Sequence, residues 1–106
     1  MRSFFVFISG YLFLAASNCF ANDLLIFSAS WCGPCQNLKR AIAADPEMTA
    51  HLQTKNIDID VDKELAKKYH VGSVPTLIIL QDNGTIRRYV GFTSSAALKK
   101  WLINTD

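Results

Sequence analysis

The sequence predicts a single α/β domain with a central mixed sheet of about four strands and helices on both faces. Its hydrophobic pattern alternates between short apolar runs, typical of strands, and the wider spacing typical of helices. The expected order is strand, helix, short helix, strand, helix, strand, strand, helix. With 106 residues, 50% of them hydrophobic, the chain has material for one core and none for a second domain.

The first two predicted elements are a buried strand and an amphipathic helix. The strand is expected at about Asp23 to Ser28, because Leu24 to Phe27 is an unbroken apolar run. The helix is expected from about Gly33 to Ala44, with Pro34 in its first turn, where a missing N–H is tolerated. The inward stripe of this helix comprises Leu38, Ile42 and Ala41. Its solvent side carries Asn37, Lys39 and Arg40.

Three elements are expected in the middle of the chain. The segment Pro46 to Thr54 fits a short helix, with Asp45 as its N-cap. Alternating apolar residues predict a strand from Lys55 to Asp60. Asp62 then caps a helix that ends at about Tyr69. The first of these helices leads into a strand that we expect to pair within the sheet.

The last part of the chain predicts a hairpin and a final helix. Thr76 to Leu80 is a continuous apolar strand, and Ile86 to Val90 is its antiparallel partner across the tight turn Asp82-Asn83-Gly84. Thr93 or Ser94 caps the last helix. The apolar residues that recur in it at helical spacing are Ala97, Leu98, Trp101 and Leu102.

Residues 1–21 have the layout of a secretory signal peptide, with a basic start, an apolar core and a small, polar tail. Cleavage after Ser17 and cleavage after Ala21 fit the pattern equally well, and only the second removes Cys19. The apolar core is short for an anchor across about 30 Å of hydrocarbon. Asn18 disfavours a lipoprotein acylated at the cysteine that follows it. We therefore expect a cleaved signal segment.

The remaining residues, 22–106, form the expected folded domain. The whole chain has 11 Lys and Arg against 9 Asp and Glu, and its basic residues occur as dispersed pairs. No basic stripe is available to neutralise phosphates, so no nucleic-acid partner is expected. We expect a monomer that is periplasmic or secreted. Because cysteine pairs in an oxidising compartment tend to rest as disulfides, sustained reductase activity there requires an electron donor that reaches across the membrane.

The segment Trp31-Cys32-Gly33-Pro34-Cys35 directly follows the first strand and places two thiols one helical turn apart. Cys32 falls at a helix N-terminus, where unpaired N–H groups favour thiolate over thiol. Such positions lower the pKa of a cysteine from about 8.5 to between about 3.5 and 7.5. Cys35 lies on the same face, deeper in the fold, and its pKa is expected to stay high.

This arrangement predicts thiol–disulfide exchange. Cys32 attacks a substrate disulfide, and Cys35 then resolves the mixed disulfide, leaving a redox disulfide Cys32–Cys35. The alternatives are a static disulfide and half of a zinc site. A structural zinc site needs four ligands, and Cys19, His51 and His70 supply no second pair at matching spacing. We expect no metal and no other cofactor.

Two further segments, Val74-Pro75-Thr76 and Val90-Gly91-Phe92, complete a resemblance to the thioredoxin family. The resemblance covers nearly all of residues 22–106 and implies a thioredoxin-like fold and a thiol:disulfide oxidoreductase acting on disulfide-containing proteins. Members of the family usually carry an additional strand and helix before these elements. The break Asp45-Pro46-Glu47 is similar to that of exported members, which implies a membrane electron donor of the DsbD type.

The resemblance also implies roles for individual residues. Cys32 is the expected nucleophile and Cys35 the resolving cysteine. Pro75 is an expected cis-proline that sets the backbone of Val74 beside Cys32 for an extended substrate, although an ordinary trans turn proline is the alternative. The expected substrate-binding residues are Trp31, Gly33, Pro34, Val74, Pro75, Gly91 and Phe92. For the two aromatic residues of that set, a plain core role is the alternative.

One departure from the family affects the chemistry. Thioredoxins keep a buried Asp on the first of these strands, where it helps to move the proton of the resolving thiol, and this chain has Ile26 there. The Lys that partners this Asp corresponds to Asn56 or, by a slipped register, to Lys55. The substitution predicts slower resolution of the mixed disulfide at neutral pH than in a typical thioredoxin.

The leading hypothesis is a secreted or periplasmic enzyme that reduces substrate disulfides, because Gly33-Pro34 between the cysteines resembles the reducing members of the family. One alternative is the same fold used as a thiol oxidant. Another is a redox-inert module that binds peptides in the Val74-Pro75 groove, and a third is a copper or zinc carrier. A disulfide isomerase is less expected, because the chain leaves no room for a dimerisation module.

Overall fold

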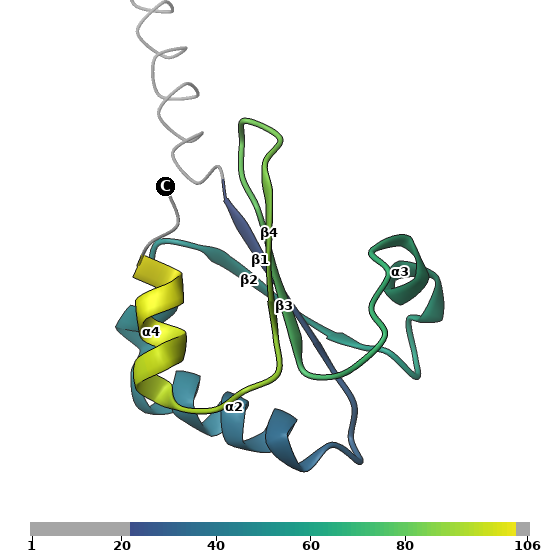
Figure 1. Cartoon of the computed structure of the whole chain (residues 1–106), viewed down its shortest axis with the longest axis horizontal. Helices are drawn as coiled ribbons and strands as arrows, with labels where there is room; N and C mark the ends of the chain where they lie inside the picture. The colour runs from purple at the N-terminus through teal and green to yellow at the C-terminus, as the bar shows by residue number, and fades with distance from the viewer. Residues whose placement is uncertain (1–21, 104–106) are drawn as a thin grey trace, which may run out of the picture.

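The computed structural model describes residues 22–103, which form one four-stranded sheet and the helices that cover it (Figure 1). The strand order is β2-β1-β3-β4. Strand β1 pairs parallel with β2 and antiparallel with β3, and β3 pairs antiparallel with β4, so the sheet is mixed, as predicted. The strand bounds are β1 Asp23–Ser28, β2 Gln53–Asp58, β3 Thr76–Leu80 and β4 Ile86–Val90.

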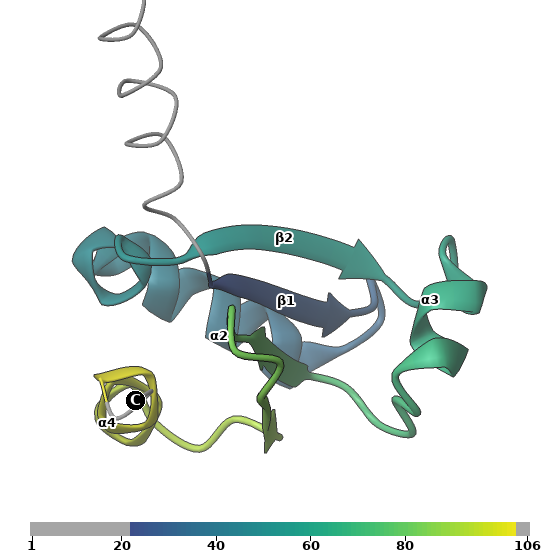
Figure 2. The same ribbon diagram turned by 90° about the horizontal axis from the view of Figure 1, so that it is seen from above.

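Helices cover both faces of the sheet, which confirms the predicted architecture. Figures 1 and 2 show α2 and α4 on one side of the strands and α3 on the other. The helix bounds are α2 Gly33–Ala44, α3 Lys63–Lys68 and α4 Ser95–Ile103, with a short 3-10 helix η2 at Pro46–Thr49. Alternate residues of a strand point to opposite faces, so β1 supplies side chains to two separate clusters.

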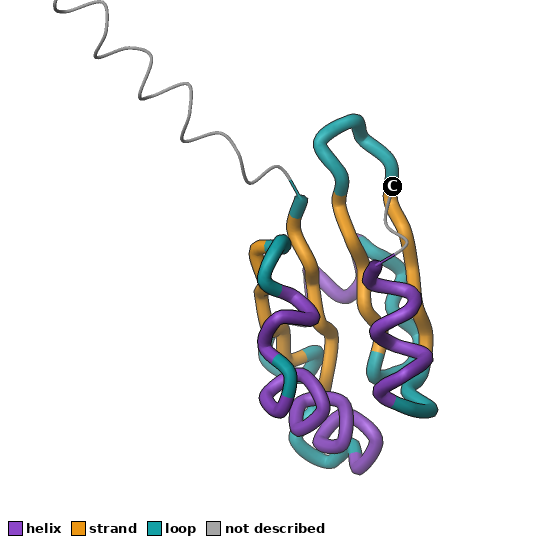
Figure 3. The backbone as a smooth tube through the Cα atoms, turned by 90° about the vertical axis from the view of Figure 1, so that its left-hand side faces the viewer, coloured by secondary structure: helices purple, strands orange, loops and turns teal. Residues whose placement is uncertain are grey.

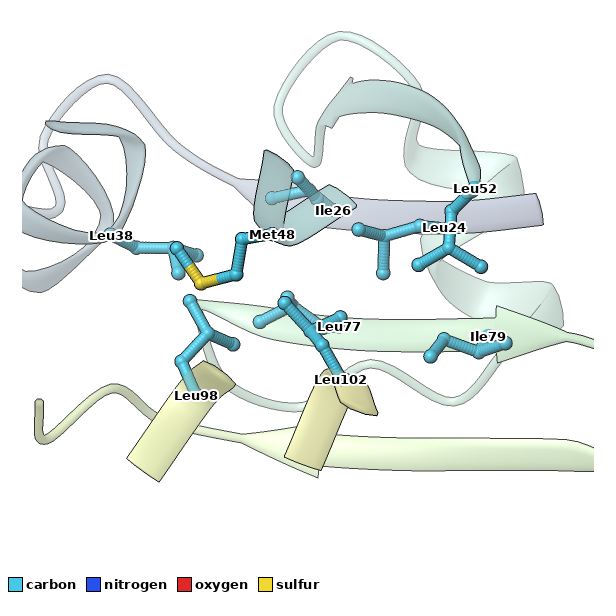
Figure 4. Packing of buried hydrophobic residues seen from close by; sticks show 9 residues of the cluster. All are labelled: Leu24, Ile26, Leu38, Met48, Leu52, Leu77, Ile79, Leu98 and Leu102. Atoms are coloured by element: carbon cyan, nitrogen blue, oxygen red, sulfur yellow. The ribbon is translucent and has the colours of Figure 1, made fainter. Parts of the chain in front are cut away.

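The larger cluster lies between the sheet and the α2 and α4 helices, which stand in front of the strands in Figure 3. Leu98 and Leu102 of α4 are fully buried against it, and burial of such a side chain contributes about 1.5–3 kcal/mol. Figure 4 shows these side chains converging between the elements. The nine buried members are Leu24, Ile26, Leu38, Met48, Leu52, Leu77, Ile79, Leu98 and Leu102.

The smaller cluster lies on the face covered by α3. Its buried members from the sheet are Leu25, Phe27, Ile57 and Ile78, and α3 contributes Ala66. These strand residues alternate with those of the larger cluster, so the unbroken apolar run in β1 reflects a strand that is buried on both faces.

Two predicted elements in the middle of the chain have different bounds. The expected helix from Pro46 to Thr54 is limited to the single turn of η2, because β2 begins at Gln53 to pair with Asp23 of β1. The strand ends at Asp58, whose carboxylate accepts a hydrogen bond from the backbone N–H of Asp60 (2.9 Å) and turns the chain. The strand predicted at 55–60 is therefore displaced by two residues at each end.

The caps of the short helices also differ from one another. Asp45 is the N-cap residue of η2, as predicted, but its side chain makes no capping hydrogen bond. Its carboxylate instead lies 3.5 Å from the ammonium of Lys99. Asp62 does cap α3, as predicted, by accepting from the N–H of Leu65 (3.4 Å).

The predicted signal segment, residues 1–21, lies outside the described residues.

Candidate active site

The cysteine pair lies where β1 passes into α2. Cys32 is the N-cap of α2, with extended backbone dihedrals (φ −93°, ψ 110°), and Pro34 lies in the first turn. Cys32 and Cys35 form a disulfide with their Cα atoms 5.2 Å apart. The backbone of Cys32 donates to the carbonyl of Ala29 (3.2 Å), which fixes the chain just before the helix.

The first turn of α2 points a backbone N–H group and the positive end of the helix dipole at the Cys32 sulfur. The backbone N–H of Cys35 donates to Sγ of Cys32 at 3.1 Å. This N–H is among those that have no carbonyl partner within the helix, and the positive end of the helix dipole acts in the same direction. Both effects stabilise negative charge on the Cys32 sulfur, so they favour its thiolate once the disulfide is opened.

The two cysteines differ in their access to solvent. Cys35 has no exposed surface, whereas Cys32 retains 4%. Ala29 packs with both cysteines, and Ile59 and Val74 cover them from the side. An incoming sulfur therefore reaches Cys32 first, whereas Cys35 is enclosed behind it.

Of the predicted groove residues outside the cysteine motif, Val74 contacts the cysteine cluster. The Val74–Pro75 peptide bond is cis, and Val74 packs against the cysteine cluster. Gly91 donates its N–H to the carbonyl of Pro75 at 2.8 Å, and its φ of +86° is a backbone conformation that favours glycine. Gly33 and Pro34 are exposed at the start of α2. The structure thus places Val74 against the cysteine pair and joins the Gly91 segment to Pro75, the next residue.

The two predicted aromatic residues have different environments. Trp31 is 68% exposed, and its indole N–H donates to the carboxylate of Asp60 (2.9 Å). The ring therefore lies on the surface beside the cysteine pair, available to a partner. Phe92 is half-buried and packs against the larger hydrophobic cluster, so it contributes to the core.

The sequence pattern does not identify Asp60 as a residue of the site. It lies 29 positions after Trp31, beyond the end of β2, and only the parallel pairing of β1 with β2 brings the two together. The sequence signal available was the run of aspartates at 58, 60 and 62, which had been assigned to a strand and a helix cap.

Ile26 belongs to the larger hydrophobic cluster. Ile26 is 2% exposed and pairs with Asn56 of β2. The ammonium of Lys55 instead lies 3.8 Å from the carboxylate of Asp23. Of the two residues suggested for the partner position, the register thus selects Asn56. Among the described residues, the buried polar side chains are those of Ser28 and Thr76. The described part of the chain therefore provides no buried acid for the resolving thiol.

Residues 22–103 also show what other sites the described part of the chain lacks. They contain no group of three or more His, Cys, Asp or Glu side chains placed to hold a metal ion. They also contain no helix with the length and apolar character needed to cross a membrane.

Comparison with known proteins gives one consistent family. The thioredoxin family model matches residues 17–104. Thioredoxin from Bacillus subtilis is 40% identical over 79 residues, which cover 74% of this chain and 75% of that protein. Thioredoxin from Chlamydia trachomatis is 36% identical and is covered to 76%, against 73% of this chain. The structure of a mutant thioredoxin from Halobacterium salinarum superposes with a TM-score of 0.68 at 32% identity, over 81% of this chain and 75% of that one.

Proposed function

This chain belongs to the thioredoxin family, and from that premise we propose that it reduces protein disulfides outside the cytoplasm through Cys32 and Cys35. It is a thiol-disulfide oxidoreductase with a redox-active cysteine pair. The direction of electron flow, the compartment and the donor are the proposed parts.

In the proposed reaction, the Cys32 thiolate attacks one sulfur of a substrate disulfide, and the other substrate sulfur leaves as a thiolate that takes up a proton. Cys35 then loses its proton and attacks the Cys32 sulfur. The bond between Cys32 and the substrate breaks, the second substrate thiol is released, and Cys32–Cys35 is left oxidised. Two electrons have passed from the pair to the substrate.

The assignment of the two roles rests chiefly on the hydrogen bond from the Cys35 N–H to Cys32 Sγ. This contact stabilises charge on one sulfur only, the one that also retains access to solvent. Cys32 is therefore the sulfur suited to attack and to leave as a thiolate. Cys35, fully enclosed, is suited to an intramolecular second step.

The reducing direction is supported by Gly33-Pro34 between the cysteines and by the relatives, which are named thioredoxins. The location is supported by the signal-like pattern of residues 1–21. In an oxidising compartment the Cys32–Cys35 disulfide must be reduced again after each turnover. We propose a membrane reductase of the DsbD type as the electron donor.

Reduction of insulin, driven by dithiothreitol, tests the activity. We expect turnover in the wild type and in Cys19→Ser, because the third cysteine takes no part in the proposed reaction. Cys32→Ser should abolish turnover. Cys35→Ala should still attack but accumulate mixed disulfides, which identify substrates and donor when trapped in the native cell. Turnover that survives in Cys32→Ser would exclude the assignment of the nucleophile.

Direction and compartment need separate measurements. Equilibration with a glutathione series should give a reducing couple, and a strongly oxidising one would favour the oxidant alternative. Cell fractionation, with mass spectrometry of the N-terminus, should find the chain outside the cytoplasm and beginning after Ser17 or after Ala21. A full-length protein confined to the cytoplasm would contradict the proposed location.

A further inference from the structure

Two hollows lie between α2 and the outer strand β2, and the side chains of Lys39 and Asn56 line both. One has a volume of about 340 Å³ and reaches Ile26. The other, of about 230 Å³, reaches Ala29 and Asp58. The sequence pattern predicts that Lys39 lies on the solvent side of α2. The structure instead places this side of the helix against the edge of the sheet.

Lys39 is a cation without a partner in the described part of the chain. Its side chain is half-buried, and no hydrogen bond or ion pair joins it to another described residue. The neighbouring Arg40 is exposed and donates to the side-chain oxygen of Asn37 (2.8 Å). The two residues carry the same charge but lie on different sides of the helix.

Lys39 lies one helical turn after Cys35, on the same face of α2. Residues four apart on a helix have Cβ atoms about 5–6 Å apart. Ala29 packs against Cys35 and also lines the second hollow together with Lys39. A single small side chain therefore borders both the enclosed thiol and a hollow that Lys39 lines.

We propose that Lys39 is a positioning residue for the second step, in which its positive charge stabilises the Cys35 thiolate that attacks the mixed disulfide. The inference rests on the proposed function, which makes Cys35 the resolving thiol. Burial disfavours a thiolate, and the described residues offer no buried acid to take its proton. The ammonium offsets that cost through space, and the proton lost by Cys35 is finally carried by the departing substrate sulfur.

The other charged groups around the site oppose this effect. Asp58 lines the second hollow with Lys39 and accepts from the N–H of Asp60. Asp60 also accepts from the indole of Trp31. Both carboxylates disfavour a thiolate nearby. Loss of the positive charge of Lys39 should therefore leave an excess of negative charge around Cys35, which disfavours its thiolate form.

A single-turnover reaction with the aromatic disulfide DTNB isolates the step. In a Cys19→Ser background, the reduced pair releases two coloured thiolates, the second of them when Cys35 attacks Cys32. We measure the rate of the second release against pH in stopped flow. The variants are Lys39→Gln, Lys39→Glu and Lys39→Arg, with Arg40→Gln as the matched loss of one charge.

We expect Lys39→Gln to move the midpoint of the second phase up by about half a pH unit, which slows it about threefold below the midpoint. Lys39→Glu should move it further, and Lys39→Arg should restore it. Arg40→Gln should leave it unchanged. Titration of the Cys35 thiolate by ultraviolet absorbance, with Cys32 also changed to Ser, should show the same order.

The inference is overturned if the pH midpoint of the second phase is unchanged in both Lys39→Gln and Lys39→Glu and both variants are folded. An equal shift in Arg40→Gln also overturns it, since the effect would then be one of overall charge. If the wild type releases no second thiolate at all, the proposed function itself fails, and the two failures are thereby distinguished. Circular dichroism of each variant separates loss of fold from loss of rate.

Discussion

At the scale of single residues, we expect Ile26 to influence how the proton of Cys35 is removed. It is buried in the larger cluster, and it lines one of the two hollows together with Lys39. An acid at this position would be buried among the apolar side chains of the larger cluster. Burial raises the pKa of a carboxyl group, which makes it a more effective proton acceptor near neutral pH.

We therefore expect Ile26→Asp to speed the second step at neutral pH and to change its pH profile. The same substitution should lower the free energy of unfolding by about 3 kcal/mol or more, because it buries a charge. Ile26→Asn is the matched polar control, which should lose stability without gaining rate. Stopped-flow rates against pH and urea unfolding provide the two measurements, and an unchanged rate in Ile26→Asp would refute the role assigned to this position.

Residue-level chemistry was predictable where it depends on neighbours in the chain. The thiols of Cys32 and Cys35 are three residues apart, so their spacing alone places one at the N-cap and the other a turn below. Asp60 and Lys39 depend on how β2 lies against β1 and α2. The sequence pattern could not identify their contacts, because an exposed strand such as β2 has no strong hydrophobic signal.

At the scale of elements, the start of α4 offers a direct test. Thr93 and Ser94 were equal candidates for its N-cap, and the structure selects Ser94, whose hydroxyl accepts from the N–H of Ala97 at 3.1 Å. The helix carries Leu98 and Leu102 into the core, so its first turn helps to hold one face of the domain.

Ser94→Ala should lower the free energy of unfolding by about 1 kcal/mol, the usual cost of a lost N-cap. Thr93→Ala is the control, because it removes a hydroxyl one residue earlier, and its effect should stay within about 0.5 kcal/mol. Urea denaturation followed by circular dichroism measures both. Equal losses in the two variants would argue against a cap at Ser94.

The predicted elements agree with the structure where both ends carry a local signal. Strand β1, helix α2 and the hairpin of β3 and β4 have the expected bounds, since Pro34, the Asp82–Gly84 turn and the apolar runs define them. The region 46–60 differs because tertiary pairing decides it. There β2 extends two residues toward η2 to match the length of β1.

At the scale of the whole molecule, the sheet has an open edge among the described residues. Strand β2 pairs with β1 on one side only, and its first four residues are exposed. An unpaired edge is a template for association, and a lysine on such a strand opposes it. Lys55 lies in that exposed run, and its ion pair with Asp23 is 58% and 31% exposed at the two side chains. Such a pair adds little stability, about 0–1 kcal/mol, so the protection of the edge is the larger role for this charge.

Lys55→Val should therefore leave the fold close to wild-type stability and promote association through β2. We expect the wild type to sediment as a monomer, and the variant to show a mass that rises with concentration, because the exposed part of the edge is then uncharged and carries a β-branched residue in place of the lysine. Lys100→Val removes the same charge from the exposed surface of α4 and should stay monomeric. A monomeric Lys55→Val, or equal association of both variants, would show that this lysine does not protect the edge.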